Sequence, residues 1–117
     1  MNNNIVHEFL KFQLYVKIYH WQTFRYSRHK SSDLLYEEFN KKMDEFIEIY
    51  MGYTGKRINV NNKIIKLENM NDKKMVRILK QFTIFLNELK NLSTDLLNIR
   101  DEILGLIHQT LYLFTLK

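Results

Sequence analysis

The sequence of 117 residues contains no cysteine, no proline and only three glycines. Without cysteine there is no disulfide framework, no thiolate metal site and no cysteine nucleophile. The lack of proline and the scarcity of glycine indicate few turns and long elements, which favours an all-helical protein. Gly52 and Gly55 fall in one short loop, whereas Gly105 interrupts a periodic apolar segment. Because glycine weakens a helix, Gly105 predicts a close contact between helices.

Long apolar runs are also absent. No basic run precedes an apolar stretch at the N-terminus, and no apolar segment approaches the roughly 20 residues that span a bilayer. We therefore expect an intracellular protein that is not secreted and has no membrane partner.

Apolar residues recur at helical spacing in four segments. They predict helices at about residues 4–24, 33–51, 71–91 and 95–116. A basic joint, 25–32, and a long irregular crossover, 56–70, separate the first three. A long crossover lets the second and third helices run parallel, so we expect a four-helix bundle that forms one domain over residues 1–117. The first helix is apolar around much of its girth, which predicts a second subunit as its cover.

Positive charge is concentrated in one part of the chain. Only Glu68 and Asp72 oppose eight basic residues between positions 56 and 80, namely Lys56, Arg57, Lys63, Lys66, Lys73, Lys74, Arg77 and Lys80. This excess could meet nucleic-acid phosphates or an acidic partner surface. The alternative is a solvated, lysine-rich helix face. The aromatic residues from Phe9 to Phe24 have helical spacing, which indicates core packing rather than base stacking.

Four potential metal ligands stand at ordered spacings: His20, His29, Asp44 and Glu48. The two acids lie one turn apart on one face of a predicted helix, beside its apolar stripe. Two carboxylates and two imidazoles suit iron or zinc. No glutamate is followed by histidine three residues later, so the di-iron centre common within one bundle is not indicated. The alternatives are exposed acids, a basic surface histidine at position 29 and an interface histidine at position 20.

These residues resemble a motif of the Dps mini-ferritins. His20-Trp21 closes the first predicted helix, His29 opens the next, an aspartate follows 15 residues later as Asp44, and Glu48 comes 4 residues after it. The resemblance implies a ferritin-like bundle with a long crossover between helices 2 and 3. It also implies that the two histidines of one subunit and the two acids of its twofold mate hold iron and oxidise it.

The same resemblance assigns supporting roles. The stretch from His29 to Tyr36 is similar to the family's His-x-x-x-Asp-x-Leu-Tyr, which places Asp33 as a partner of His29. Trp21 would lie close to the iron. The implied assembly is at least a dimer, and the implied activity is that of a ferroxidase.

A second resemblance extends over more of the chain. The stretches 9–23, 28–30, 95–102 and 110–116 are similar to small uncharacterised proteins of large DNA viruses and tailed phages. This resemblance implies a viral setting and no activity. Two functions follow as predictions: an iron-binding protein with ferroxidase activity, or a non-enzymatic viral protein that contacts virion or capsid partners and nucleic acid.

Overall fold

The computed structural model describes residues 3–61 and 63–117 and contains four helices within them. They are α1 (Asn3–Gln22), α2 (Tyr26–Thr54), α3 (Asp72–Asn87) and α4 (Thr94–Leu113). No strand occurs in these residues, so the predicted all-α class is confirmed. Residues 1, 2 and 62 of the predicted 1–117 domain lie outside the described part.

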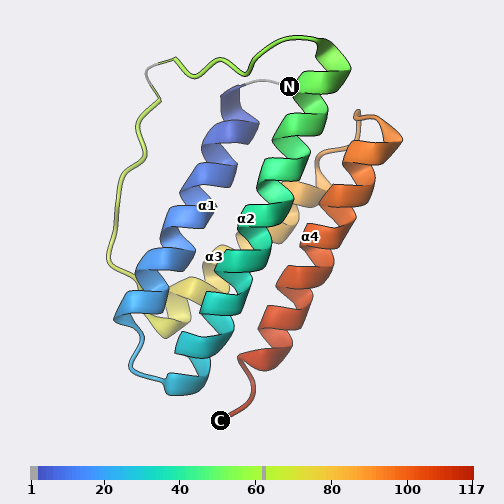
Figure 1. Cartoon of the computed structure of the whole chain (residues 1–117). Coiled ribbons are helices and arrows are strands. Elements are labelled where there is room, and N and C mark those ends of the chain that lie inside the picture. The colour runs from blue at the N-terminus through green and yellow to red at the C-terminus, as the bar shows by residue number, and fades with distance from the viewer. Residues whose placement is uncertain (1–2, 62) are drawn as a thin grey trace.

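The helices form four neighbouring pairs: α1–α2, α2–α4, α4–α3 and α3–α1. In Figure 1, α1 runs downward, α2 and α3 run upward and α4 returns downward, so α2 and α3 are parallel. The crossover passes from the upper end of α2 to the lower end of α3 along the outside of α1. The 29 residues of α2 extend about 43 Å at 1.5 Å each. They therefore set the long dimension of the molecule, which is 45 Å.

Helix α2 begins seven residues earlier than the predicted position 33, because the predicted joint 25–32 is mostly helical. Only Thr23, Phe24 and Arg25 connect it to α1. The first turns of α2 bury Ser31 and Ser32, whose polarity makes them look like loop residues in the sequence. Helix α3 ends at Asn87, before the predicted position 91.

Aromatic rings fill the centre of the core. Phe12 stacks on Phe82 with centroids 4.0 Å apart, and Phe9 and Phe39 meet this pair edge-on. Such contacts stabilise a core beyond the area that they bury. The apolar stripes predicted for all four helices supply this core.

The described parts of the crossover, residues 55–61 and 63–71, are held along α1 by side chains spaced about two helical turns apart. His7 contacts the carbonyl oxygen of Ile64 at 2.9 Å, Tyr15 donates to the carbonyl oxygen of Lys66 at 2.9 Å, and Gln22 accepts from the backbone N–H of Met70 at 2.6 Å. The crossover thus provides part of the cover that the apolar first helix requires. The prediction for Gly105 is wrong: a Cβ there would meet no atom within 4 Å. No helix in the described residues has the length and apolar character needed to span a membrane.

Candidate functional site

His20, near the end of α1, and His29, in the second turn of α2, form a reciprocal pair. The Nδ1 of His20 lies 2.8 Å from the carbonyl oxygen of His29, and the Nδ1 of His29 lies 2.9 Å from the carbonyl oxygen of His20. The two rings stack with centroids 4.0 Å apart at an angle of 17°. Buried Ser32 donates to the His29 carbonyl at 3.1 Å. We call this arrangement the histidine clasp, because it joins the two helices across their short connection.

The histidine clasp determines which ring nitrogen of each imidazole is already engaged. A carbonyl oxygen only accepts, so Nδ1 carries a proton in both rings, and Nε2 is the ring nitrogen that is not used by the clasp. A metal ion must lie close to the ring plane of each histidine ligand, about 2.1 Å from its nitrogen. Two nearly parallel rings 4.0 Å apart have no such common position. The pair can share one ion only if a ring rotates and breaks its backbone hydrogen bond.

The roles predicted for Asp33 and Trp21 beside the histidines stay predictions, and the structure describes the surroundings of both side chains. Asp33 faces His20 rather than His29, with its Oδ1 3.9 Å from Nε2 of His20. Trp21 is 68% exposed and does not pack into the core, and Phe24 is fully exposed. The prediction that both aromatic residues contribute to core packing is therefore wrong.

The predicted acidic ligands, Asp44 and Glu48, lie far along α2 from the histidines of the same chain. Fifteen residues separate His29 from Asp44, a rise of about 22 Å. Both acids are exposed and line a groove of about 270 Å³ between α1 and α2. The other residues lining this groove are Val6, Phe9, Leu10, Met43, Ile47, Met51 and Ile58. In the described residues, no three His, Asp or Glu side chains converge on a metal position.

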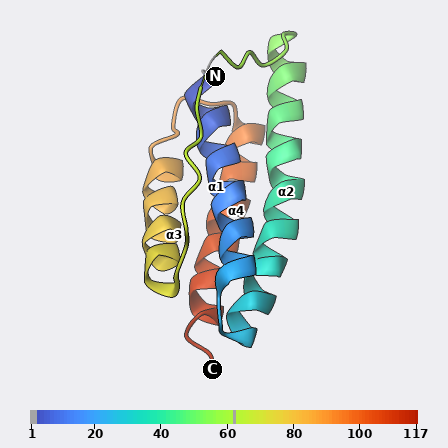
Figure 2. The same ribbon diagram turned by 90° about the vertical axis from the view of Figure 1, so that its left-hand side faces the viewer.

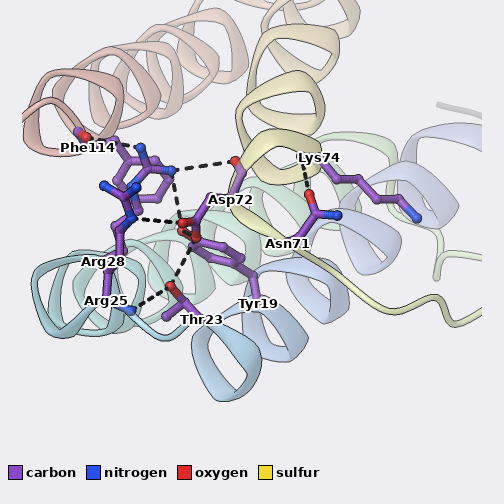
Figure 3. A network of polar contacts seen from close by, with 8 residues as sticks. All are labelled: Tyr19, Thr23, Arg25, Arg28, Asn71, Asp72, Lys74 and Phe114. Atoms are coloured by element: carbon purple, nitrogen blue, oxygen red, sulfur yellow. Dashed lines mark hydrogen bonds and ion pairs between the residues drawn. The ribbon is translucent and has the colours of Figure 1, made fainter.

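A polar network surrounds the point at which the crossover enters α3 (Figure 3). The sequence pattern did not predict this network. Asp72, the first residue of α3, accepts hydrogen bonds from Tyr19 at 2.7 Å and Thr23 at 3.1 Å. Its second oxygen lies 3.0 Å from Nε of Arg25. Asp72 therefore ties the start of α3 to the end of α1 and to the joint. Its position after the cap residue Asn71 made it look like an ordinary N-terminal acid.

Arg28 extends this network to α4. Its guanidinium lies 3.4 Å from the hydroxyl of Tyr19 and donates to the carbonyl oxygens of Asp72 at 3.5 Å and Phe114 at 3.2 Å. The same group lies over the Phe114 ring, 4.6 Å from its centroid. A cation at the C-terminal end of α4 also suits the negative end of the helix dipole.

The electrostatics of the network follow from these contacts. Although burial alone would raise it, the hydrogen bonds from Tyr19 and Thr23 and the charges of Arg28 and Arg25 hold the pKa of Asp72 below its ordinary value. Burial, with the hydrogen bond to Asp72 in support, raises the pKa of Tyr19. Asp72 is thus an ionised acceptor and Tyr19 a neutral donor at neutral pH, an arrangement suited to holding elements together.

The basic segment is mostly exposed. Of its eight cations only Lys74 is half-buried, and within the described residues it is the one that forms an ion pair, with Glu68 at 3.1 Å. Lys74 is also the main cause that lowers the pKa of Glu68. Lys73, Arg77 and Lys80 occupy one exposed row of α3. Glu68 is thus paired with Lys74, and Asp72 is paired with Arg25. Neither acid of the described segment therefore neutralises the exposed row of Lys73, Arg77 and Lys80, which we call the uncompensated row.

Comparison with known proteins identifies a family and a phage relative of this chain. Residues 20–114 match the model of a family of unknown function (DUF5856). The chain is also 30% identical over 106 residues to the uncharacterized 14.6 kDa protein in the mobD-ri intergenic region of Enterobacteria phage T4. That alignment covers 90% of this chain and 80% of the phage protein. No solved structure matches the chain. The resemblance to small viral proteins is confirmed, and the comparisons add no support for a mini-ferritin.

Proposed function

The chain belongs to the DUF5856 family, and we propose that it acts without catalysis, as a small helical interaction protein of a virus, in the virion or inside the infected cell. The observation that carries the proposal is the histidine clasp. The side chains that carry the motif, His20 and His29, direct their Nδ1 atoms to backbone carbonyls and join two helices. Their arrangement serves the packing of the bundle.

The fold suits this role as a scaffold. Parallel α2 and α3 joined by one long crossover are the connectivity of ferritin-like bundles, which supports the finer proposal of a ferritin-like fold. One scaffold carries many unrelated functions, so such a likeness implies no iron chemistry by itself. The partners that we propose are a second copy of the chain and viral or capsid proteins.

Metal titration tests this proposal directly. Ferrous iron is added under air to protein that carries no histidine tag, and bound metal is measured by mass spectrometry. We expect less than one equivalent per chain and oxidation no faster than in buffer, for the natural protein and for Asp44→Ala alike. Binding of about one to two equivalents that is lost in Asp44→Ala would contradict the proposal.

A second candidate function is iron binding between two copies, with ferroxidase activity. The observation that favours it is that the clasp uses only Nδ1 of each half-buried histidine and leaves Nε2 outside it, on the helix pair that also exposes Asp44 and Glu48. In this candidate, His20 and His29 would be imidazole ligands, and the acids of a second copy would supply oxygen ligands and charge balance. One histidine ring would have to leave the clasp.

Assembly measurements separate the two candidates. If iron is held between copies, adding it converts a monomer into a dimer in light scattering, and Glu48→Gln abolishes both the binding and the conversion. Glu45→Gln is the matched control, since Glu45 lies on the same helix outside the groove. An assembly state that is indifferent to iron leaves the non-catalytic proposal standing.

A further inference from the structure

Three exposed aromatic side chains surround the α1–α2 joint within six residues. Trp21 is 68% exposed, Tyr26 is 72% exposed and Phe24 is fully exposed. None of them belongs to the aromatic core. Figure 1 and Figure 2 place this joint at one end of the bundle, the end at which the chain also terminates. Large apolar groups gathered on a surface mark a place that becomes covered by another surface.

Cations accompany these rings. Nζ of Lys17 lies 5.6 Å from the centroid of Trp21, and Nζ of Lys30 lies 5.7 Å from the centroid of Tyr26. Arg25 stands between Phe24 and Tyr26 in the chain, and its guanidinium is bound to Asp72. We call Lys17, Trp21, Phe24, Arg25, Tyr26 and Lys30 the joint surface.

We propose that the joint surface docks reversibly on a lipid bilayer that contains anionic headgroups. The aromatic rings would lie at the level of the headgroups, and the lysine ammonium groups would reach the phosphates. Aromatic side chains flanked by Lys and Arg are the composition of protein segments at such interfaces. The contact is peripheral and needs no spanning helix. It goes beyond the proposed interaction function and differs from the expectation of no membrane partner, which considered spanning segments alone.

Two of the three rings have a face occupied, which reduces the ring area that the joint surface offers to stacked bases. Lys17 lies over the Trp21 ring, and Tyr26 has Lys30 over its ring and His29 stacked at 6.3 Å, whereas the Phe24 ring is fully exposed. A lysine beside a ring at an interface, in contrast, extends past it toward the headgroups.

The joint is also held rigid before any contact. The histidine clasp fixes both of its flanks, and Arg25 is anchored to Asp72 at 3.0 Å. A pre-organised surface loses little conformational entropy on docking. The three residues between the helices can therefore present Phe24 outward in one arrangement.

The experiment uses the only tryptophan of the chain, which lies within the joint surface. The full chain is titrated with vesicles of phosphatidylcholine alone and of phosphatidylcholine mixed with phosphatidylglycerol, and the emission of Trp21 is recorded with co-sedimentation in parallel. We expect a blue shift and sedimentation with the mixed vesicles only. Phe24→Ser and Lys30→Glu should each weaken binding about fivefold or more.

Two matched variants test whether the loss of any exposed ring, or the reversal of any exposed charge, would weaken binding equally. Tyr53→Ser removes a 71% exposed aromatic ring in the last turn of α2, at the opposite end of that helix from the joint, and Lys90→Glu reverses an exposed charge in the loop before α4; neither should alter binding. Phe24 is fully exposed, so its replacement leaves folding intact. The proposal is overturned if mixed vesicles produce no shift or if Phe24→Ser binds as the natural protein does. It is equally overturned by a shift that follows protein concentration without lipid, which indicates self-association, or by a shift with single-stranded DNA alone.

Discussion

His20 and His29 hold each other through four atoms: each Nδ1 contacts the other residue's carbonyl oxygen, at 2.8 and 2.9 Å, and the rings stack between them. Neither side chain can leave without affecting the other. Because the clasp connects α1 and α2 where only three residues join them, it fixes the angle at which the helices meet and the positions of the exposed rings beside it.

Replacing either histidine of the clasp should destabilise the fold. We expect His20→Ala and His29→Ala each to lower the free energy of unfolding by about 1–2 kcal/mol, from one lost hydrogen bond and the stacked ring. In the double variant the losses should fall short of their sum by about 1 kcal/mol, because each change already removes the shared contact. Urea unfolding followed by circular dichroism measures all three. His108→Ala, at an exposed position of α4, should change stability by less than about 0.5 kcal/mol. Strict additivity would show that the rings act independently.

Arg28 should not be replaceable by lysine. Its planar guanidinium reaches Tyr19, the Asp72 carbonyl and the Phe114 carbonyl at once, which a single ammonium group cannot do. We expect both Arg28→Ala and Arg28→Lys to reduce stability by about 1–2 kcal/mol, whereas Arg77→Lys on exposed α3 should be neutral. Thermal unfolding provides the comparison. Full stability in Arg28→Lys would mean that charge alone matters at this position.

The contribution of Asp72 should disappear in acid. The folded-state pKa of Asp72 lies below the unfolded value of about 3.9, so its stabilising effect is complete above that value and is lost as the pH falls through the folded pKa. We expect Asp72→Asn to lower the free energy of unfolding by about 1 kcal/mol at pH 7, since the side chain is partly exposed, and by less at pH 2. Asp101→Asn, which removes an exposed pair with Arg100, is the control. A stability difference that is equally large at both pH values would contradict this assignment.

The repeating apolar residues predicted four helices, the long crossover and the parallel course of α2 and α3, because helical periodicity is a local property. The start of α2 was missed because Arg28, Ser31 and Ser32 are polar. Except for Nε of Arg28, their side-chain polar groups have distant or backbone partners, such as the Phe114 carbonyl and the Arg28 carbonyl, that a local pattern does not reveal.

The candidate site was also predicted only in part, because its contacts include backbone atoms. Spacing grouped His20 with His29 as metal ligands, which stays a prediction; the structure brings the two residues into contact through Nδ1 atoms and backbone carbonyls, and no pattern of residue types encodes a backbone acceptor. Trp21 and Phe24 continue the aromatic run of α1, which predicted packing. Helix α1 ends at Gln22, and beyond it the periodicity no longer determines which face a side chain occupies. The assignment of Asp44 and Glu48 as metal ligands stays a prediction, since it depends on a second copy.

The two most informative glycines should respond in opposite directions. Gly105 lies in the exposed part of α4 with open space around a would-be Cβ, so Gly105→Ala should raise stability by about 0.5–1 kcal/mol through helix propensity. Gly55 ends α2 with φ of 72°, and Gly55→Ala should lower stability by about 1 kcal/mol. Differential scanning calorimetry measures both. If Gly105→Ala instead weakens the protein, and does so more at higher protein concentration, this surface is in contact with a second copy.

The uncompensated row on α3 permits a test of which basic residues contact nucleic acid. A count of basic residues in the sequence would not distinguish among them. If Lys73, Arg77 and Lys80 contact the phosphate backbone of duplex DNA, binding is independent of sequence, and the logarithm of the affinity falls with the logarithm of salt concentration. Each of Lys73→Gln, Arg77→Gln and Lys80→Gln should then reduce that slope by about 0.9, whereas Lys41→Gln, which removes a cation paired with Glu38 on α2, should leave it unchanged. Fluorescence anisotropy of a labelled duplex over a range of salt gives the slope.

Because Lys74 is already bound to Glu68, Lys74→Gln should have less effect on the slope than the substitutions of its exposed neighbours. Equal effects from all five variants would indicate that net charge, and not this row of α3, attracts the duplex.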